Sequence, residues 1–191
     1  ISGNMNPDQP WSTLRAAIAT EPNDPAGSAF MKFSSTCFYF GQELSLALAG
    51  KGPPPPIGLI HTSFGGSTIE QWLDKKTIAT CANATLSKAN GEWHTARVLP
   101  YASMTLKGWV WYQGENDMHG FFGNSAQQTG YSCLMARLVH AWRELWSATA
   151  GTTDPHAPFG LVTLAPSGTE GGNDIGTMRW AQTAGNDIGT M

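Results

Sequence analysis

Two apolar runs along the chain end abruptly in polar or very small residues. Residues 106–112 close with Trp-Val-Trp-Tyr and are followed at once by Gln-Gly-Glu. Residues 57–60 are followed by a small-residue turn at 62–66. An apolar run that stops in this way is typical of a buried strand whose end delivers side chains to a sheet edge, where open α/β sheets bind their ligands. The two runs therefore predict two strands that share one site.

The segments around these runs have helical periodicity. One stripe of apolar residues recurs every three or four positions and predicts an amphipathic helix that ends at a glycine: Phe33, Cys37, Phe40, Leu44 and Leu48. The same spacing across residues 131–145 predicts the clearest helix of the chain. Ser67 or Thr68 can cap a short helix at residues 69–72, and residues 159–164 form a third predicted strand.

This alternation of helices and strands predicts an α/β fold with a parallel sheet, right-handed crossovers and helices on both faces. Residues 1–29 are rich in Pro, Asn and Asp and are expected to be irregular, so the ordered domain is predicted at 30–184. Residues 75–101 are expected to be loop with short helix. The sequence GNDIGTM occurs at 172–178 and again at 185–191, and a repeat array needs about three longer copies. The tail at 185–191 is therefore interpreted as an artefact.

Composition narrows the function classes. The chain has 191 residues, of which 41% are hydrophobic and 13% charged, which is typical of one globular domain. The net charge of -3 and the dispersed Lys and Arg residues argue against a nucleic-acid partner. The sequence contains no apolar stretch of the length that crosses a bilayer and no pattern of a signal peptide, so membrane insertion is not expected.

The cysteines and one tripeptide give information on metal binding and on the cellular compartment of the protein. Cys37, Cys81 and Cys133 match neither a paired metal spacing nor Cys-x-x-Cys, so no metal and no cofactor is predicted. One disulfide plus one buried thiol is an open possibility. Asn83-Ala84-Thr85 is a glycosylation acceptor sequence, which favours the secretory pathway. The eight tryptophans are interpreted mainly as core residues, with stacking on sugar rings as the alternative.

The residues at the two strand ends suit the chemistry of ester hydrolysis. Gly65 and Gly66 can present backbone N–H groups at the start of a helix, and Gln113 can add a carboxamide donor. Together they form a candidate oxyanion hole. The structural alternative is a tight turn at Gly65-Gly66 and a polar strand terminus at Gln113. Glu115 can cap the turn, orient Gln113 or lie near the catalytic base.

The sequence does not identify a nucleophile or a base. Ser63 resembles the serine of the Gly-x-Ser-x-Gly elbow, but His61 stands where that motif requires glycine, so Ser63 is not expected to be the nucleophile. None of the five histidines lies in a sequence pattern that identifies a base. His119 is the histidine nearest to the predicted site and is the candidate among them, whereas His140 is interpreted as a surface or packing residue.

Two long blocks, residues 57–72 and 106–116, closely resemble the sialate O-acetylesterases. The flanking segments resemble that family in the same order: 31–46, 131–146, 158–164 and 179–184. The resemblance implies an SGNH-type hydrolase, a three-layer α/β/α sandwich that removes acetyl groups from hydroxyls of sialic acids. It also implies that Gly66, with Gly65 beside it, and Gln113 contribute to the oxyanion hole, and that Glu115 is the matching acid of the second block.

The resemblance lacks both ends of a catalytic triad. The family's serine lies in a Gly-Gln-Ser-Asn-Met segment, which residues 2–5 match only by coincidence, and its histidine lies in an Asp-Ile-His-Pro-like segment that is not found here. The chain is therefore expected to be the central part of the catalytic domain, incomplete at both ends and inactive alone. In the whole enzyme a serine would form an acetyl-enzyme.

Other functions remain open from sequence. A decayed hydrolase fold that only binds carbohydrate or a protein partner is the alternative from a different class. An esterase of the acetyl-xylan type is the alternative within the enzymes, because the same donors suit any small acyl group on a sugar. The expected partner is acetylated sialic acid or another acetylated glycan, and the expected location is secreted or lysosomal.

Overall fold

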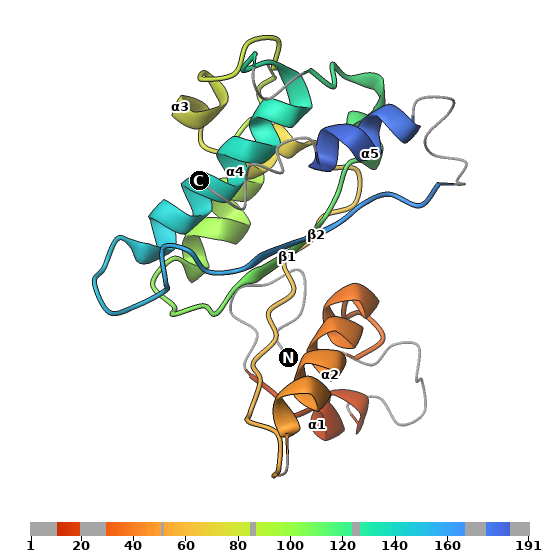
Figure 1. Ribbon diagram of the computed structural model, residues 1–191, viewed down its shortest axis with the longest axis vertical. Helices are drawn as coiled ribbons and strands as arrows, with labels where there is room; N and C mark the ends of the chain where they lie inside the picture. The colour runs from red at the N-terminus through yellow and green to blue at the C-terminus, as the bar shows by residue number, and fades with distance from the viewer. Residues whose placement is uncertain are drawn as a thin grey trace. The chain divides into compact units, whose positions relative to one another are not determined.

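The computed structural model describes residues 11–19, 30–50, 52–84, 87–123, 127–166 and 175–183. The chain divides into two compact units, Ile1–Gly65 and Gly66–Met191, and each is described by itself (Figure 1). The duplicated tail at 185–191 lies outside the described residues. The domain limits of 30 and 184 stay a prediction.

The first unit contains α1 (Leu14–Ala19) and α2 (Ser35–Ala49). α1 lies in the range predicted to be irregular, so that prediction is wrong for these six residues. α2 confirms the predicted helix: Ser34 Oγ accepts the Cys37 N–H at 3.2 Å, and Gly50 ends the helix with φ +51°. The predicted stripe is only partly buried, because Phe33 is 7% exposed whereas Leu48 is 54% exposed.

The strand predicted at residues 57–60 is wrong. Residues 57–59 have no strand pairing, and residue 60 makes a single bridge. A strand requires a partner for its backbone groups, and here the segment packs through side chains on α2 instead. The helix has a glycine at the contact, since a Cβ on Gly41 would lie 2.6 Å from Leu59 Cδ1.

The second unit is built around two parallel strands, β1 (Trp109–Tyr112) and β2 (Phe159–Val162), with Trp109 opposite Phe159. They confirm two of the predicted strands and their parallel arrangement. Both are shorter than predicted, because side chains take over the backbone groups beyond the ladder. Leu106 N–H donates to Thr153 Oγ1 at 2.8 Å, and Leu164 N–H donates to Gln182 Oε1 at 3.1 Å. Within the described residues the sheet has two strands.

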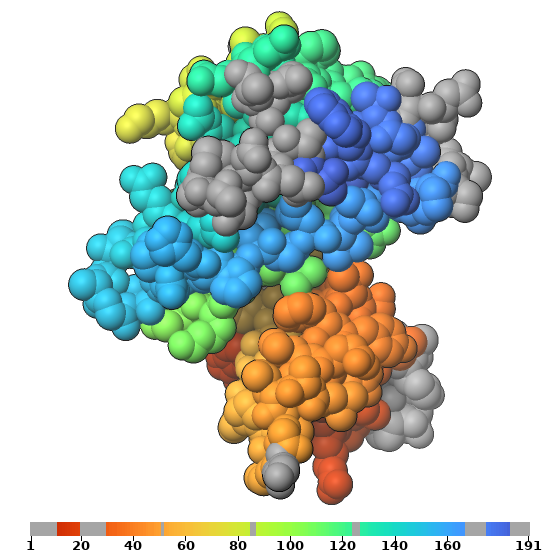
Figure 2. Space-filling view, viewed as in Figure 1, coloured from red at the N-terminus to blue at the C-terminus, as the bar shows by residue number. Residues whose placement is uncertain are grey.

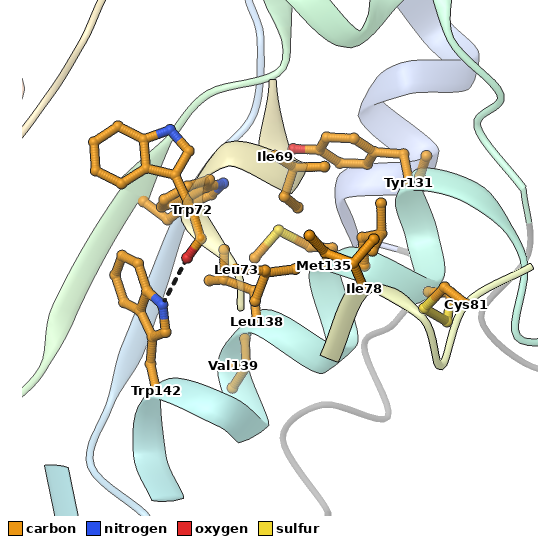
Figure 3. Packing of buried hydrophobic residues seen from close by; sticks show 14 of the residues in the cluster. Ile69, Trp72, Leu73, Ile78, Cys81, Tyr131, Met135, Leu138, Val139 and Trp142 are labelled. Carbon is orange, nitrogen blue, oxygen red and sulfur yellow. Dashed lines mark hydrogen bonds between the residues drawn. A yellow bond between two sulfur atoms is a disulfide. The ribbon is translucent and has the colours of Figure 1, made fainter. Parts of the chain in front are cut away.

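The main helix of the second unit, α4 (Gly130–Ser147), confirms the clearest helical prediction. The apolar face of α4 forms the core together with residues that follow the turn at Gly65-Gly66. Figure 3 shows Leu73 and Leu138 among the side chains that meet there. Trp142 Nε1 donates to the Trp72 carbonyl at 3.3 Å. The tryptophan prediction is confirmed for four buried residues whose rings pack on one another in T-shaped or tilted pairs: Trp72, Trp111, Trp142 and Trp146.

Short elements complete the second unit: η2 (Ile69–Trp72), α3 (Lys75–Ile78), η3 (His94–Val98), η4 (Leu99–Tyr101), η5 (Glu115–His119) and α5 (Ile175–Thr183). η2 follows Thr68 as predicted. In the space-filling view α5 lies at the surface of this unit, in dark blue (Figure 2). None of the helices in the described ranges has the length and apolarity needed to cross a membrane.

A disulfide joins Cys81 to Cys133 at the start of α4 (Figure 3). Beside it, Ala82 and Thr129 form a parallel bridge. The predicted possibility of one disulfide plus one thiol is therefore confirmed, with Cys37 as the free, partly buried thiol. A disulfide that closes a loop of 52 residues stabilises a fold by about 4 kcal/mol, because it lowers the conformational entropy of the unfolded chain.

Candidate active site

The turn that precedes η2 is fixed by hydrogen bonds. Gly66 has φ +78°, a conformation that favours glycine. Asn116 Nδ2 donates to the Gly66 carbonyl oxygen. Ser67 Oγ accepts the Trp72 Nε1 hydrogen at 2.9 Å, and the Thr68 N–H donates to Gln71 Oε1 at 2.9 Å. Hydrogen bonds to backbone groups and to a side chain therefore fix the conformation of this turn.

Gln113 leaves the end of β1 with its carboxamide buried, at 7% exposure. Its Nε2 donates to the Ser67 carbonyl oxygen at 2.9 Å and also to Asp117 Oδ2. Its Oε1 accepts the Tyr131 hydroxyl at 3.1 Å. Both ends of the carboxamide therefore have partners, and the nitrogen lies at the turn that follows Gly66.

Gly114 allows the chain to reverse immediately after Gln113. Its φ of +142° lies in the region that favours glycine, and an added Cβ would lie 3.0 Å from Gln182 Nε2. The reversal starts η5, which carries Asp117 back toward the carboxamide. Gln182 Nε2 completes the arrangement by donating to the Gln113 carbonyl at 2.7 Å.

Asp117 is buried at 8% exposure and accepts the Ile69 N–H at 3.1 Å through Oδ2. Burial is the largest effect on its carboxyl group and raises its pKa to about 7. The Gln113 hydrogen bond lowers the pKa, whereas the charge of Glu70 raises it. Burial also raises the pKa of the Tyr131 hydroxyl, so this group stays a neutral donor at physiological pH.

Glu70, Asp117 and Tyr131 line a small cleft together with Asn83, Gly120 and Phe121. Buried donors and acceptors of this kind can orient a polar group. Within the described ranges, no three His, Cys, Asp or Glu side chains gather as they would around a metal ion. The chemistry that the geometry offers is hydrogen-bond donation from a backbone turn and a fixed carboxamide.

Comparison with known proteins places the chain in a family. A family model described as carbohydrate esterase, sialic acid-specific acetylesterase, matches residues 6–149. The chain belongs to this family.

Individual sialic acid-specific acetylesterases extend the match. The sialate O-acetylesterases of Homo sapiens and Pongo abelii are 32% and 29% identical to the chain over 201 residues, covering 95% of the chain and 36% of each relative. The Mus musculus sialate O-acetylesterase is 28% identical over 195 residues, covering 81% of the chain and 34% of the relative. The chain therefore spans about a third of the length of these curated relatives.

The structure brings together two of the acetylesterase residues predicted from sequence. Gln113 Nε2 donates to the carbonyl oxygen of Ser67, the residue after Gly66, so Gly66 and Gln113 lie near each other. Glu115 is half-buried at the start of η5, and its charge raises the pKa of Asp117. Gly65 is exposed at the end of the first unit. His119 is exposed at the end of η5 and makes none of the hydrogen bonds of this network.

Sequence reasoning missed the residues that hold Gln113: Asp117 and Tyr131 bind its carboxamide, and Gln182 binds its backbone carbonyl oxygen. Asp117 carried a weak signal, because it is an acid beside the buried Met118 in a segment that follows a strand end. Tyr131 and Gln182 gave none, since they are 18 and 69 positions from Gln113.

The first unit contains a serine–histidine contact that the sequence pattern did not predict. His61 Nε2 lies 2.5 Å from Ser63 Oγ, and His61 Nδ1 accepts the Ser34 N–H at 3.2 Å. An Nδ1 that accepts leaves the proton of the neutral ring on Nε2. His61 therefore donates to Ser63, whereas a catalytic base must accept the serine proton.

Proposed function

We propose that this chain provides the oxyanion-binding part of a serine carbohydrate O-acetylesterase, with Gly66 and Gln113 as donors. The observation that carries the proposal is the 2.9 Å hydrogen bond from Gln113 Nε2 to the Ser67 carbonyl, because it brings the carboxamide to the turn after Gly66. Family membership supports it. The wider fold we propose is the SGNH-type three-layer α/β/α sandwich, in which β1 and β2 belong to a larger parallel sheet.

In the proposed reaction a serine hydroxyl gives its proton to a histidine and attacks the acetyl carbonyl carbon. The carbonyl oxygen becomes an oxyanion, which the Gly66 N–H and one N–H of Gln113 hold. The sugar hydroxyl leaves with the proton from the histidine. Water then loses a proton to the histidine and cleaves the acetyl-enzyme, which releases acetate and restores the serine.

We propose that this nucleophile is not Ser63, because His61 donates to Ser63 Oγ and cannot remove its proton in that tautomer. Because the family's serine and histidine segments find no match in this sequence, we also propose that both residues lie outside these 191 residues and that the chain alone is inactive. Incubation with a chromogenic acetate ester tests this proposal. No saturable hydrolysis is expected; saturable hydrolysis that Ser63→Ala abolishes would overturn it.

The oxyanion role is tested in the full-length natural protein. Gln113→Ala should lower kcat by about 10²–10³-fold, the usual cost of removing one oxyanion donor. Gln42→Ala, on an exposed position of α2, is the matched control and should leave kcat unchanged. An unchanged kcat in Gln113→Ala would contradict the role.

The substrate we propose is sialic acid acetylated on a hydroxyl, because the family is one of sialic acid-specific acetylesterases. An acetyl-xylan substrate offers the same ester to the same donors. Acetate release from acetylated sialic acid and from acetylated xylan, measured side by side, separates the two. Faster release from xylan would overturn the sialic acid proposal.

A non-catalytic carbohydrate-binding protein is the second candidate. The observation that favours it is that Gln113 Nε2 already donates to the Ser67 carbonyl oxygen and to Asp117 Oδ2. The carboxamide therefore has a structural role in the absence of substrate. The complete coding sequence discriminates between the candidates. Serine and histidine blocks flanking this region support the esterase, and their absence supports the binding protein.

We propose a secreted or lysosomal location with a glycan on Asn83. The Cys81–Cys133 disulfide supports an oxidising compartment, and Asn83 is exposed in a turn with φ +58°. Expression through a eukaryotic secretory pathway, followed by N-glycosidase treatment, tests this. A mass shift that Asn83→Gln removes is expected, and its absence would contradict the proposal.

A further inference from the structure

Asp117 joins two segments that both belong to the proposed oxyanion site. Its Oδ2 accepts the Ile69 N–H at 3.1 Å, at the start of η2, and also accepts Gln113 Nε2. Ile69 follows Gly66 closely in the chain. One oxygen atom therefore fixes the position of the carboxamide relative to the turn that carries the backbone donor.

The surroundings leave the carboxamide one orientation. Tyr131 donates its hydroxyl hydrogen to Gln113 Oε1 at 3.1 Å, so the oxygen end faces α4 and the nitrogen end faces Asp117. A flipped carboxamide would place its nitrogen against the hydroxyl and its oxygen against the carboxylate, where no hydrogen would lie between two acceptors. All three side chains are buried, which strengthens the preference.

We propose that Asp117 is a positioning residue of the esterase, whose carboxylate oxygen holds the Gln113 carboxamide in the orientation that the oxyanion requires. Asp117 acts through Gln113 and does not touch the substrate. The inference rests on the proposed function of Gln113 and goes beyond it by naming the residue that sets its geometry. Hydrogen bonds to a carboxylate are stronger than neutral ones, which suits this holding role.

The charges around Asp117 make its hold sensitive to protonation. Glu70 faces it from η2, Glu115 from its own helix and Tyr131 from α4. Burial and these acids raise the pKa of Asp117 to about 7. A protonated carboxyl is a weaker acceptor, so the Ile69 N–H and the Gln113 carboxamide should both report its titration.

The first test is spectroscopic and uses the chain itself. In ¹⁵N-resolved NMR spectra, the Ile69 backbone amide and the Gln113 carboxamide should shift together with pH, with one midpoint near 7. Asp117→Asn should remove the shift while both signals remain, because an asparagine oxygen can accept the same hydrogens without a charge. Signals that do not move together, or that still titrate in Asp117→Asn, would overturn the proposal.

The second test is a double-mutant cycle in the full-length natural protein. Asp117→Ala should lower kcat by about 10–100-fold with little change in KM, as expected from a misplaced donor, and Asp117→Asn should recover most of the loss. In a Gln113→Ala background, Asp117→Ala should cost nothing more. Glu144→Gln, at an exposed acid of α4, is the matched control. Additive losses would overturn the positioning role, whereas an unchanged kcat in Gln113→Ala alone would count against the proposed function itself.

Discussion

Gln182 Nε2 donates to the backbone carbonyl oxygen of Gln113 at 2.7 Å, across 69 positions of the chain. The same carboxamide accepts the Leu164 N–H at 3.1 Å through Oε1. One buried side chain thus satisfies backbone groups just beyond the ends of β1 and β2. It also ties α5 to the edge of the sheet where the candidate site lies.

Gln182→Ala should destabilise the protein by about 1–3 kcal/mol, because it leaves the buried Leu164 N–H without its partner. The Gln113 carbonyl oxygen would keep only the Tyr131 hydroxyl, at 3.4 Å. Denaturant unfolding followed by tryptophan fluorescence measures the change. Thr177→Ala, at an exposed position on the same helix, is the control and should change the free energy of unfolding by less than about 0.5 kcal/mol. Equal effects of the two substitutions would contradict the role given to Gln182.

Gly114→Ala should cost about 1–3 kcal/mol, because alanine at φ +142° is strained and its Cβ would press on Gln182 Nε2. Gly65→Ala is the matched control. Its φ is not in the left-handed region, and an added Cβ would meet nothing within 4 Å. Thermal unfolding of both variants checks the prediction, which fails if Gly114→Ala melts like the unsubstituted chain.

Removing the Cys81–Cys133 disulfide should lower the free energy of unfolding by about 4 kcal/mol, from the loop of 52 residues that it closes. Unfolding of a Cys81→Ala, Cys133→Ala double variant measures the loss. Cys37→Ala is the control, because it keeps the disulfide and should change the free energy of unfolding much less. If reductant lowered the stability of the double variant and the Cys37 variant equally, the disulfide would not be the cause.

The contribution of Asp117 to the free energy of unfolding should fall as pH rises from about 4 to about 7. The pKa of its carboxyl group is 3.8 when exposed, as in the unfolded chain, and about 7 when buried in the folded chain. Over this pH window the folded chain therefore binds a proton that the unfolded chain has lost. Below the window both states are protonated, and above it both are charged. Subtracting the pH profile of Asp117→Asn isolates this contribution, and a flat difference between pH 4 and 7 would contradict it.

Regular patterns predicted much of the second unit. The spacing of apolar residues gave α4, because that helix buries one continuous face, and the apolar runs gave β1 and β2. The same reasoning failed at residues 57–60, where the apolar residues pack on α2 rather than pairing in a ladder. Hydrophobicity indicates burial, but a strand also depends on a neighbour that local sequence does not identify.

The candidate site was predictable in part for a similar reason. Gln113 stands directly after an apolar run, so its place at a strand end can be inferred from sequence. Its contacts with Ser67 and Gln182 join positions 46 and 69 residues apart, and no local pattern specifies them. The protonation of His61 depends on the Ser34 N–H, which is 27 positions away and equally outside any local pattern.

The carboxamide nitrogen of Gln113 already has acceptors of its own in Ser67 and Asp117. A substrate in the proposed esterase would therefore exchange one partner for another instead of filling an empty place. The neutral ester carbonyl gains little by such an exchange, whereas a developing negative charge outcompetes the Ser67 carbonyl. A donor that is occupied at rest thus discriminates between ground state and transition state, and its contribution would be seen in kcat rather than in KM.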